Sequence, residues 1–328
     1  MIKDLSKFSF LLFLSLTLVM TSCDDDDDEE PTPTPSGPTQ NIAELAVASP
    51  QFSILVEALT ATNLVDAVAA DGSMTVFAPN NDAFNEFFDQ QGLTDDDGDG
   101  SRVDEAAAAL GPDAVSELLL YHVIGSEIPA SAVTAQTYVS TSSTTSPEGD
   151  ALSLLAEPAN NTVWVNGGSG KGATVVAADI FATNGVIHEI DGVLELPSVV
   201  DHAIFNSNLT TLVGAVTTAN LVATLDTTSN ITVFAPDNNA FDQITVPTEV
   251  SELTAVLTYH VLDSQVRSGQ IPTDAPVATL NGGDIEFNVE NETTVVITDA
   301  NMNERTVVIP DVQGTNGVVH VIDGVLLP

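Results

Sequence analysis

The 328-residue chain has very few basic residues and a single cysteine. Six Lys and Arg stand against 47 Asp and Glu, giving a formal net charge of −41 at pH 7. Binding to nucleic acid needs basic patches that neutralise phosphates, so the composition excludes nucleic acid as a partner. It also argues against anionic lipid headgroups as ligands. Because a lone thiol cannot form an internal disulfide, the fold must rest on hydrophobic burial, for which the 43% hydrophobic content is ample.

The N-terminal segment has the pattern of a secretory leader. Two lysines precede an apolar run from Phe8 to Met20, which is short for a membrane span. The run leads into a Met-Thr-Ser-Cys sequence that ends at Cys23 and resembles a bacterial lipobox, in which the cysteine is acylated and becomes the new N-terminus. We expect residues 1–22 to be a lipoprotein signal peptide and Cys23 to carry the membrane anchor. An ordinary signal peptide with an incidental cysteine is the alternative.

Seven successive acidic residues, Asp24 to Glu30, follow the cysteine. Such a block repels itself and stays unfolded. It resembles the acidic signal that sends Bacteroidota lipoproteins to the outer face of the outer membrane, and a charged spacer is the bland alternative. Prolines recurring from Pro31 to Pro38 then favour an extended stalk. Residues 23–40 are therefore expected to be an anchor and stalk, and the protein an outer-membrane lipoprotein exposed on the cell surface.

The remainder of the chain repeats itself once. The order of the repeated blocks is the same in both halves, so a whole domain is duplicated, with a period far longer than the ~20–50 residues of a solenoid unit. Two copies without an obvious reaction centre usually provide binding surface, repeated for reach or avidity. We place the copies at 41–197 and 198–328. The blocks are Thr-Val-Phe-Ala-Pro at 75–79 and 232–236, Tyr-His at 121–122 and 259–260, and Asn-Gly-Val-(Ile/Val)-His at 184–188 and 316–320.

Within each copy, helical patterns come first and strand patterns later. Phe52, Leu55 and Leu59 give one apolar helical face, and Leu209, Leu212 and Val216 repeat it. This order of elements indicates the α+β class. The expected strands, separated by Asn-Gly and Asp-Gly turn signals, are Thr162–Asn166, Thr174–Ile180, Val186–Ile190 and Val193–Leu196, then Ile285–Val289, Thr294–Ile297, Thr306–Ile309 and Val318–Ile322.

The repeated blocks, taken together, resemble the fasciclin domain. The resemblance covers both copies, essentially the whole chain after the stalk. It implies two tandem fasciclin-like domains, each a β-wedge of about seven strands with packed helices. The role it implies is adhesion or matrix interaction outside the cell, without catalysis.

The resemblance also implies a binding role for the Tyr-His pairs, Tyr121 with His122 and Tyr259 with His260, because that neighbourhood is a proposed receptor-binding motif in animal members. From the residues themselves we expect the histidines to be partly buried and held by hydrogen bonds. The sequence shows no nucleophile elbow, and the only cysteine belongs to the anchor. We therefore expect a protein that is not an enzyme.

Copy one contains an acidic insert. Its offset to copy two is 157 residues up to Phe84 but 138 at Tyr121, so it carries 19 additional residues between them. Asp95, Asp97 and Asp99 occupy alternate positions in this insert, and Gly100 allows the sharp turn that an EF-hand-like calcium loop needs. With Asp104 as a further oxygen donor, they form a candidate Ca²⁺ site, and a solvated acidic loop is the alternative. The closing glutamate of an EF-hand is replaced by alanine at position twelve.

These observations predict a non-catalytic surface lipoprotein that mediates adhesion or extracellular-matrix and biofilm contact. Its partners would be a membrane, through the lipid, and an extracellular protein or polysaccharide. The alternative is a polysaccharide-binding accessory lipoprotein of a glycan uptake system. Glycan-binding faces usually present exposed aromatics, so the alternative gains if Trp164, the only tryptophan, is exposed beside Tyr138.

Overall fold

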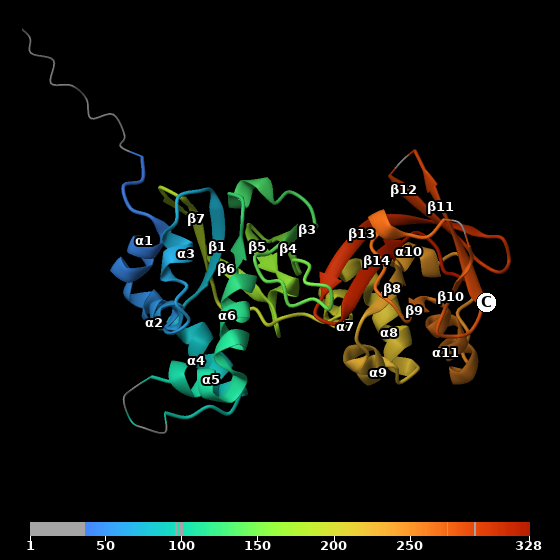
Figure 1. The fold of residues 1–328 in the computed structure, drawn as a ribbon, viewed down its shortest axis with the longest axis horizontal. Coiled ribbons are helices and arrows are strands. Elements are labelled where there is room, and N and C mark those ends of the chain that lie inside the picture. The colour runs from blue at the N-terminus through green and yellow to red at the C-terminus, as the bar shows by residue number, and fades with distance from the viewer. Residues whose placement is uncertain (1–36, 96–97, 99–100, 274, 292) are drawn as a thin grey trace, which may run out of the picture. The chain divides into compact units, whose positions relative to one another are not determined.

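The computed structural model describes residues 37–95, 98, 101–273, 275–291 and 293–328. The expected signal peptide, Cys23 and the acidic block that follows it lie outside the described residues. Pro38–Pro328 forms one compact unit that contains both copies of the repeat (Figure 1). We call the copies domain one (41–197) and domain two (198–328).

In the described part of domain one, helices pack against a seven-stranded sheet of order β2-β1-β7-β6-β5-β4-β3. Strand β1 runs parallel to β7, and the other neighbouring pairs are antiparallel. The elements are α1 (Ile42–Ala48), η1 (Pro50–Phe52), α2 (Ser53–Ala61), α3 (Val65–Ala69), β1 (Met74–Pro79), α4 (Asn81–Gln90), α5 (Val103–Leu110), α6 (Pro112–Tyr121), β2 (Val123–Ile124), η2 (Ala130–Ala132), β3 (Thr137–Ser140), β4 (Ser153–Ala159), β5 (Thr162–Val165), η3 (Asn166–Gly168), β6 (Ala173–Ala182) and β7 (Gly185–Ile190).

Domain two repeats this arrangement, with sheet order β10-β11-β12-β13-β14-β8-β9 and β8 parallel to β14. The two sheets confirm the α+β class and the seven strands that the resemblance implied. The elements are α7 (Val199–Phe205), η4 (Ser207–Leu209), α8 (Thr210–Thr218), α9 (Val222–Thr227), β8 (Ile231–Pro236), α10 (Asn238–Phe241), α11 (Val250–Tyr259), β9 (Val261–Leu262), η5 (Ser268–Gln270), β10 (Val277–Ala278), β11 (Asp284–Glu290), β12 (Thr294–Thr298), β13 (Glu304–Gly314) and β14 (Gly317–Ile322).

Short polar side chains fix the first helix of each domain. Asn41 accepts a hydrogen bond from the backbone of Glu44, whose carboxylate accepts one in return from the backbone of Asn41. Ser198 and Asp201 form the same reciprocal cap at the start of α7. Such a capping box satisfies two amides that the first turn leaves unpaired, so both domains begin at a defined residue.

Each domain has two hydrophobic clusters, one mostly from helices and one mostly from strands. Phe52 and Leu55 lie in the helical cluster of domain one, and Phe77 lies in its strand cluster. The clusters of the two domains are separate, although Tyr138 of domain one also packs against a cluster of domain two. Each domain therefore has a core of its own.

Among the described residues no single helix is long and apolar enough to cross a membrane. One bent pair, Ile42–Ala48 with Pro50–Ala61, meets that test by length and composition only.

Two features differ from the sequence expectation. Val193–Leu196 is not a strand, because the backbone amide of Leu194 donates to the imidazole of His122 instead of to a neighbouring strand. The acidic insert, expected to be a loop, contributes helix α5, whose residues 106–109 are four consecutive alanines. Alanine has the highest helix propensity of all residues, so this run folds into a helix that packs against α2 and α6.

Candidate functional site

The Tyr-His pair of domain one lies in the interior. Tyr121 is fully buried, and its hydroxyl donates to the carbonyl of Ser153 (2.8 Å) and accepts from the side-chain amide of Asn166 (2.9 Å). The imidazole of His122 bonds at Nδ1 to the carbonyl of Leu118 (2.8 Å) and at Nε2 to the amide of Leu194 (2.9 Å). A carbonyl requires a donor and an amide requires an acceptor, so these partners fix one neutral tautomer.

Domain two repeats the arrangement. The hydroxyl of Tyr259 donates to the carbonyl of Asp284 and accepts from the amide of Ala300. His260 bonds through its two ring nitrogens to the backbones of Val256 and Leu326, at 2.8 and 2.9 Å. The Tyr-His pair expected to bind a partner is thus buried in both domains, and direct contact through these side chains would require the fold to open.

Burial sets the ionisation of these groups. Desolvation lowers the pKa of His122 and of His260 to about 4, against an ordinary value of 6.5, and outweighs the backbone hydrogen bond that favours the charged form. Desolvation also raises the pKa of the Tyr121 hydroxyl. Both histidines are therefore neutral near pH 7 and act as connectors between a helix and the segment after the last strand.

The second histidine of each domain holds a β-bulge. Nδ1 of His188 accepts from the amide of Asp179 (3.2 Å), and Nε2 donates to the carbonyl of Ile128 (2.9 Å). His320 makes the same contacts with Asp311 and Val266. Both aspartates have a positive φ, 59° and 58°, where the strand register shifts. The expectation that the histidines are buried and held by hydrogen bonds is confirmed, and their nitrogens are already engaged.

A fifth histidine, His202 on α7, was missed by the sequence reasoning. It is buried, with Nε2 bonded to the carbonyl of Gln313 (3.0 Å), and its ring meets the ring of Tyr138 edge-on at a centroid distance of 5.9 Å. Burial lowers its pKa to about 4. The corresponding residue of domain one is Leu45. This exchange of an apolar residue for a histidine at one position of the duplicated helix is the signal that could have found it.

The described part of the chain contains no group of three or more His, Cys, Asp or Glu side chains that could hold a metal ion. Asp97 and Asp99 of the candidate calcium loop lie outside that part. Of the other two residues, Asp95 accepts from the amide of Gly98 (2.7 Å), and Asp104 is exposed in the first turn of α5. Calcium binding by this insert stays a prediction.

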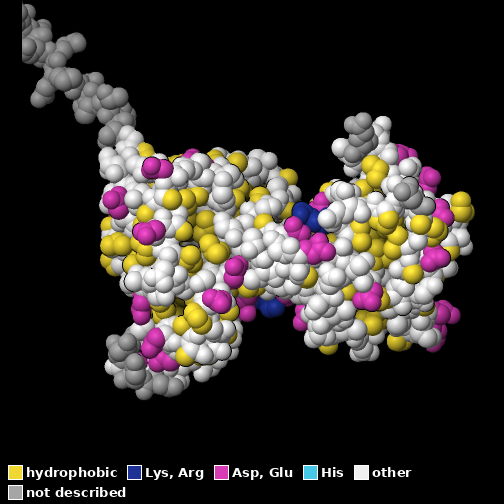
Figure 2. All heavy atoms as spheres, in the orientation of Figure 1, with side chains coloured by type: hydrophobic (Ala, Val, Ile, Leu, Met, Phe, Trp, Pro, Cys, Tyr) yellow, Lys and Arg dark blue, Asp and Glu magenta, His cyan; other side chains and the backbone are white. Residues whose placement is uncertain are grey.

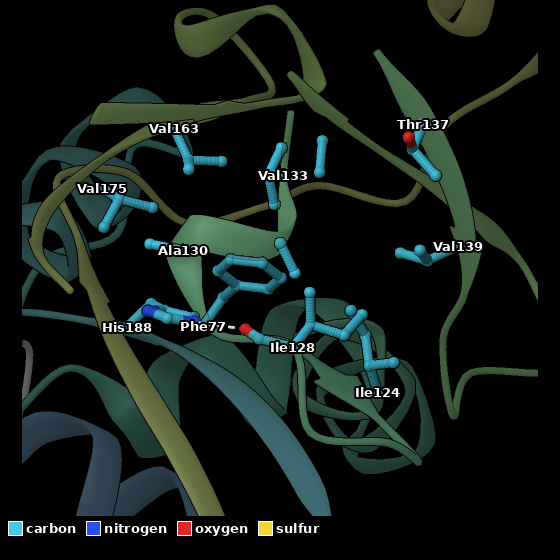
Figure 3. Close-up of a pocket in the computed structure, with 12 residues that line it drawn as sticks. Phe77, Ile124, Ile128, Ala130, Val133, Thr137, Val139, Val163, Val175 and His188 are labelled. Atoms are coloured by element: carbon cyan, nitrogen blue, oxygen red, sulfur yellow. Dashed lines mark hydrogen bonds between the residues drawn. The ribbon is translucent and has the colours of Figure 1, made fainter. Parts of the chain in front are cut away.

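Domain one contains an apolar cavity of about 130 Å³ on the strand side of its core, which we call the strand-side cavity (Figure 3). Val133, Val163 and Val175 line it, and Phe77 and His188 lie together at one end with ring centroids 5.6 Å apart. The imidazole nitrogens of His188 are occupied as described above, so the cavity presents almost only hydrocarbon. It has the character of a packing defect or an apolar binding site, and not of a reaction centre.

Two of the few basic side chains join the domains. Lys171 of domain one pairs with Asp201 of domain two at 2.8 Å, and Arg267 of domain two pairs with Asp150 of domain one at 2.5 Å. Burial would lower the pKa of Lys171, but the hydrogen bond and charge of Asp201 outweigh it and raise the pKa. Figure 2 shows how sparse the basic side chains are beside the acidic ones. Two of the few basic side chains thus form ion pairs between the domains.

Trp164 and Tyr138, the aromatic residues considered for glycan binding, do not form a shared exposed surface. Trp164 is 37% exposed on β5, with its ring directly beside the backbone of Gly168. The hydroxyl of Tyr138 instead accepts from the side chain of Asn206 in domain two, and its ring meets His202. Only one of the two aromatics is available to a sugar ring.

Comparison with known proteins gives the family. The fasciclin domain model matches residues 50–197 and 207–328, which lie one in each copy. The chain therefore belongs to the fasciclin domain family and carries two tandem copies of the domain, as the resemblance of the repeated blocks predicted.

Relatives come from several kingdoms. The chain is 36% identical over 139 residues to Protein sll1483 of Synechocystis sp., a match that covers 40% of this chain and 73% of that protein. It is 31% identical over 166 residues to human periostin, covering 48% of this chain and 19% of periostin. It is 25% identical over 296 residues to the fasciclin-like arabinogalactan protein CTB11 of Cercospora beticola, covering 88% of this chain and 76% of that protein.

Among solved structures, a FAS1 domain pair from the insect cell adhesion molecule fasciclin I is similar to the chain. The sequences are 20% identical, the match covers 83% of this chain and 95% of that chain, and the TM-score is 0.47.

Proposed function

We propose that this chain is a non-catalytic, lipid-anchored protein of the outer cell surface that mediates adhesion, through contact with extracellular matrix or biofilm polymer. Fasciclin domains occur in cell adhesion proteins, and the solved pair described above comes from one. The observation that carries the proposal is that both domains keep their histidines inside and bonded to backbone, so the polar chemistry of each domain serves its own architecture. The solvent-facing surfaces are what remains for function.

The duplication supports an adhesive role. Two linked modules convert a second binding event into an intramolecular one, which raises avidity without any new contact. The ion pairs at Lys171 and Arg267 hold the two modules in one compact unit. A ligand that is itself repetitive, such as a matrix protein or polymer, would engage both surfaces at once.

The anchor is tested first, with cells that express the full chain or its Cys23→Ala variant. Lipidation of Cys23 predicts that the wild-type chain sediments with membranes, while the variant is released. External protease on intact cells should degrade the wild-type chain. A wild-type chain that resists external protease while remaining in the membrane fraction would refute surface exposure.

Adhesion is then measured as retention of the same cells under flow on surfaces coated with matrix protein or with biofilm polysaccharide. Cells with the wild-type chain should be retained more than cells with Cys23→Ala, in which the same amount of protein is made but not displayed. Equal retention on every coating would refute the adhesion proposal. The glycan-uptake alternative is less favoured, because Tyr138 is engaged with Asn206 and leaves Trp164 without an aromatic partner.

A further inference from the structure

Domain two contains a cavity of about 300 Å³ beneath its helices, which we call the helix-side cavity. It is enclosed by α7, α8, α9 and α11 and by strands β8 and β9, with Val199, Leu212, Val216 and Leu257 among its lining residues. Ile204 and Val222 also line it and are 54% and 36% exposed, so the cavity opens to solvent between apolar side chains. An apolar cavity of about 150 Å³ suffices to hold benzene, so this one has room for a larger guest.

The side chains that line the cavity offer a guest no free hydrogen-bond donor. Its two polar lining residues are Thr217 and His260. The hydroxyl of Thr217 donates to the carbonyl of Val213 (2.7 Å), and both nitrogens of His260 bond to backbone. A polar guest would lose more hydration than this wall can replace, so the chemistry of the wall favours a hydrocarbon.

Charge narrows the choice further. None of the lining residues is basic, and Lys171, the basic residue paired with α7, is already bonded to Asp201. The chain carries 47 acidic residues, so a carboxylate or phosphate headgroup at the mouth would meet a repulsive field. The guest that fits is uncharged.

Domain one shows that the fold does not require this cavity. The corresponding space there is about 20 Å³, and most of its lining residues are equivalents of those in domain two, offset by 157 positions up to Phe77 and by 138 from Leu119. Three nearby positions carry a larger side chain in domain one, whereas Val200, Ile204 and Leu225 of the cavity wall are larger than their domain-one equivalents. Two of them, Ile42 with Val199 and Leu59 with Val216, line the space in both domains, whereas at the third Phe52 lines the space of domain one and Leu209 packs in the helical cluster of domain two without lining its cavity.

The open wall is visible in the strand below it. Val76 of β1 is buried beneath the helices of domain one at 6% exposure, whereas its equivalent Val233 of β8 is only half-buried and faces the cavity. An unfilled apolar cavity is destabilising because its lining atoms lack contact partners. An occupant would restore those contacts.

We propose that domain two binds the alkyl chain of an uncharged molecule, such as a fatty alcohol or a neutral lipid, in the helix-side cavity. This binding is independent of the adhesive role proposed above. It makes domain two a ligand-binding module and domain one its filled counterpart.

The test uses the full chain with Cys23→Ala, so that no acyl chain of its own competes. The neutral fluorescent probe N-phenyl-1-naphthylamine is titrated into the protein and then displaced with 1-octanol or with octanoate, which share a chain length but differ in charge. We expect saturable binding of the probe at one site and displacement by octanol at concentrations about tenfold lower than by octanoate. Absence of saturable binding, or equal displacement by both, would overturn the proposal.

The decisive variant gives domain two the residues of domain one at two lining positions, Val199→Ile with Val216→Leu. It should weaken probe binding about tenfold or more while the melting temperature stays level or rises, because added side-chain atoms replace the guest. Val308→Leu, an equivalent enlargement at a 51% exposed position on β13, should leave binding unchanged. Undiminished binding by the double variant would place the probe elsewhere and refute the site.

A second variant covers the event that the double variant fails to fold. Val222→Asp puts a carboxylate at the mouth of the cavity, at the first residue of α9, where an acidic side chain suits the helix dipole. It should weaken binding of the probe and of octanol without loss of folding. Sedimentation velocity tests whether a second copy of the chain covers the apolar mouth instead. The proposal would be refuted in favour of that dimer if the wild-type chain is a dimer, Val222→Asp dissociates it, and the probe shows no saturable binding.

Discussion

Where domain one has Ala156 on β4, domain two has Phe287 on β11, and where domain two has Leu209, domain one has Phe52. The pairing of Ala156 with Val165 and of Phe287 with Ile297 shows that the first two residues are equivalent. The rings of Phe287 and Phe234 are tilted to one another with centroids 5.6 Å apart, in the region where domain one has its strand-side cavity. Domain two thus has a phenylalanine where domain one has space on the strand side, and domain one has the larger Ile42 and Leu59 where Val199 and Val216 line the helix-side cavity of domain two, so one fold can hold an apolar cavity on either side of its sheet.

We expect the largest effects on stability, similar in the two domains, from substitution of one buried asparagine in each domain. The side chain of Asn184 makes three hydrogen bonds to backbone, with Ile42, Val68 and Ala70, and Asn316 makes four. Asn184→Ala or Asn316→Ala should destabilise its own domain by about 4 kcal/mol, because buried backbone groups lose their partners.

Trp164, the only tryptophan, makes this measurable, since its fluorescence reports unfolding of domain one while circular dichroism reports both domains. Asn184→Ala should shift the fluorescence transition, and Asn316→Ala should shift only the part of the dichroism signal that fluorescence does not follow. Asn239→Ala, at an exposed position, is the matched control. Equal shifts of both transitions by either variant would show that the domains unfold as one.

Substitution of Phe287 tests whether this side chain fills the strand side of domain two. Phe287→Ala gives domain two the residue of domain one and should cost about 3 kcal/mol, through lost burial and a new cavity. Phe181→Ala, at a 48% exposed position, should be close to neutral. A loss for Phe287→Ala as small as that of the control would mean that Phe287 does not fill the strand side, and calorimetric unfolding measures both.

The stability of the two domains should respond differently to acid. Burial lowers the pKa of His260 and of its domain-one equivalent His122 to about 4, and domain two contains in addition His202, whose pKa burial also lowers to about 4 and whose place Leu45 takes in domain one. A histidine with a folded pKa near 4 and an unfolded pKa near 6.5 binds its proton in the unfolded chain first. Stability is then complete above about pH 6.5 and falls as the pH drops toward 4, by about 2 kcal/mol per histidine at pH 5.

Domain two should therefore unfold at a higher pH than domain one in an acid titration followed by dichroism and tryptophan fluorescence. His202→Leu, which restores the residue of domain one, should narrow the gap between the two midpoints. Coincident midpoints in the wild-type chain would refute the difference.

The smallest effect is expected at the contact between domains. Lys171→Met removes the partner of Asp201, and because the lysine side chain is 40% exposed the loss should stay below about 1 kcal/mol and vanish in high salt. Asp201 retains its bond to the amide of Ser198, so α7 keeps its cap. Arg102→Met, which breaks a pair within domain one, is the control. The readout is the separation of the two unfolding transitions with and without salt, and a separation that Lys171→Met leaves unchanged in low salt would assign the pair no role in coupling the domains.

The repeated blocks allowed the family, the fold class and most of the strands to be predicted, because each block carries a local rule. The expected strand Val186–Ile190, which follows an Asn-Gly turn signal, lies within β7, and the expected strand Thr174–Ile180 lies within β6. The parallel pairing of β1 with β7 could not be predicted from local rules, since it joins residues more than 100 positions apart. Val193–Leu196 misled for the same reason: its pattern is strand-like, but His122, distant in sequence, takes the amide of Leu194.

The candidate sites were harder to predict than the fold. Burial of the Tyr-His pairs depends on Asn166 and Leu194, which no local pattern connects to them. The helix-side cavity depends on differences of single methyl or methylene groups between equivalent positions, such as Leu59 and Val216, whose effect appears only when the helices are packed.

Asn184 and Asn316 also bear on how such a chain can grow. Each asparagine lies just before the last strand of its domain and accepts a hydrogen bond from the first helix, at Ile42 or at Val199. The first helix and the start of the last strand of each domain are thereby joined at one residue. A segment whose ends meet can be copied head to tail in the gene without disturbing its interior, so the length of the protein would change in whole units as copies are gained or lost.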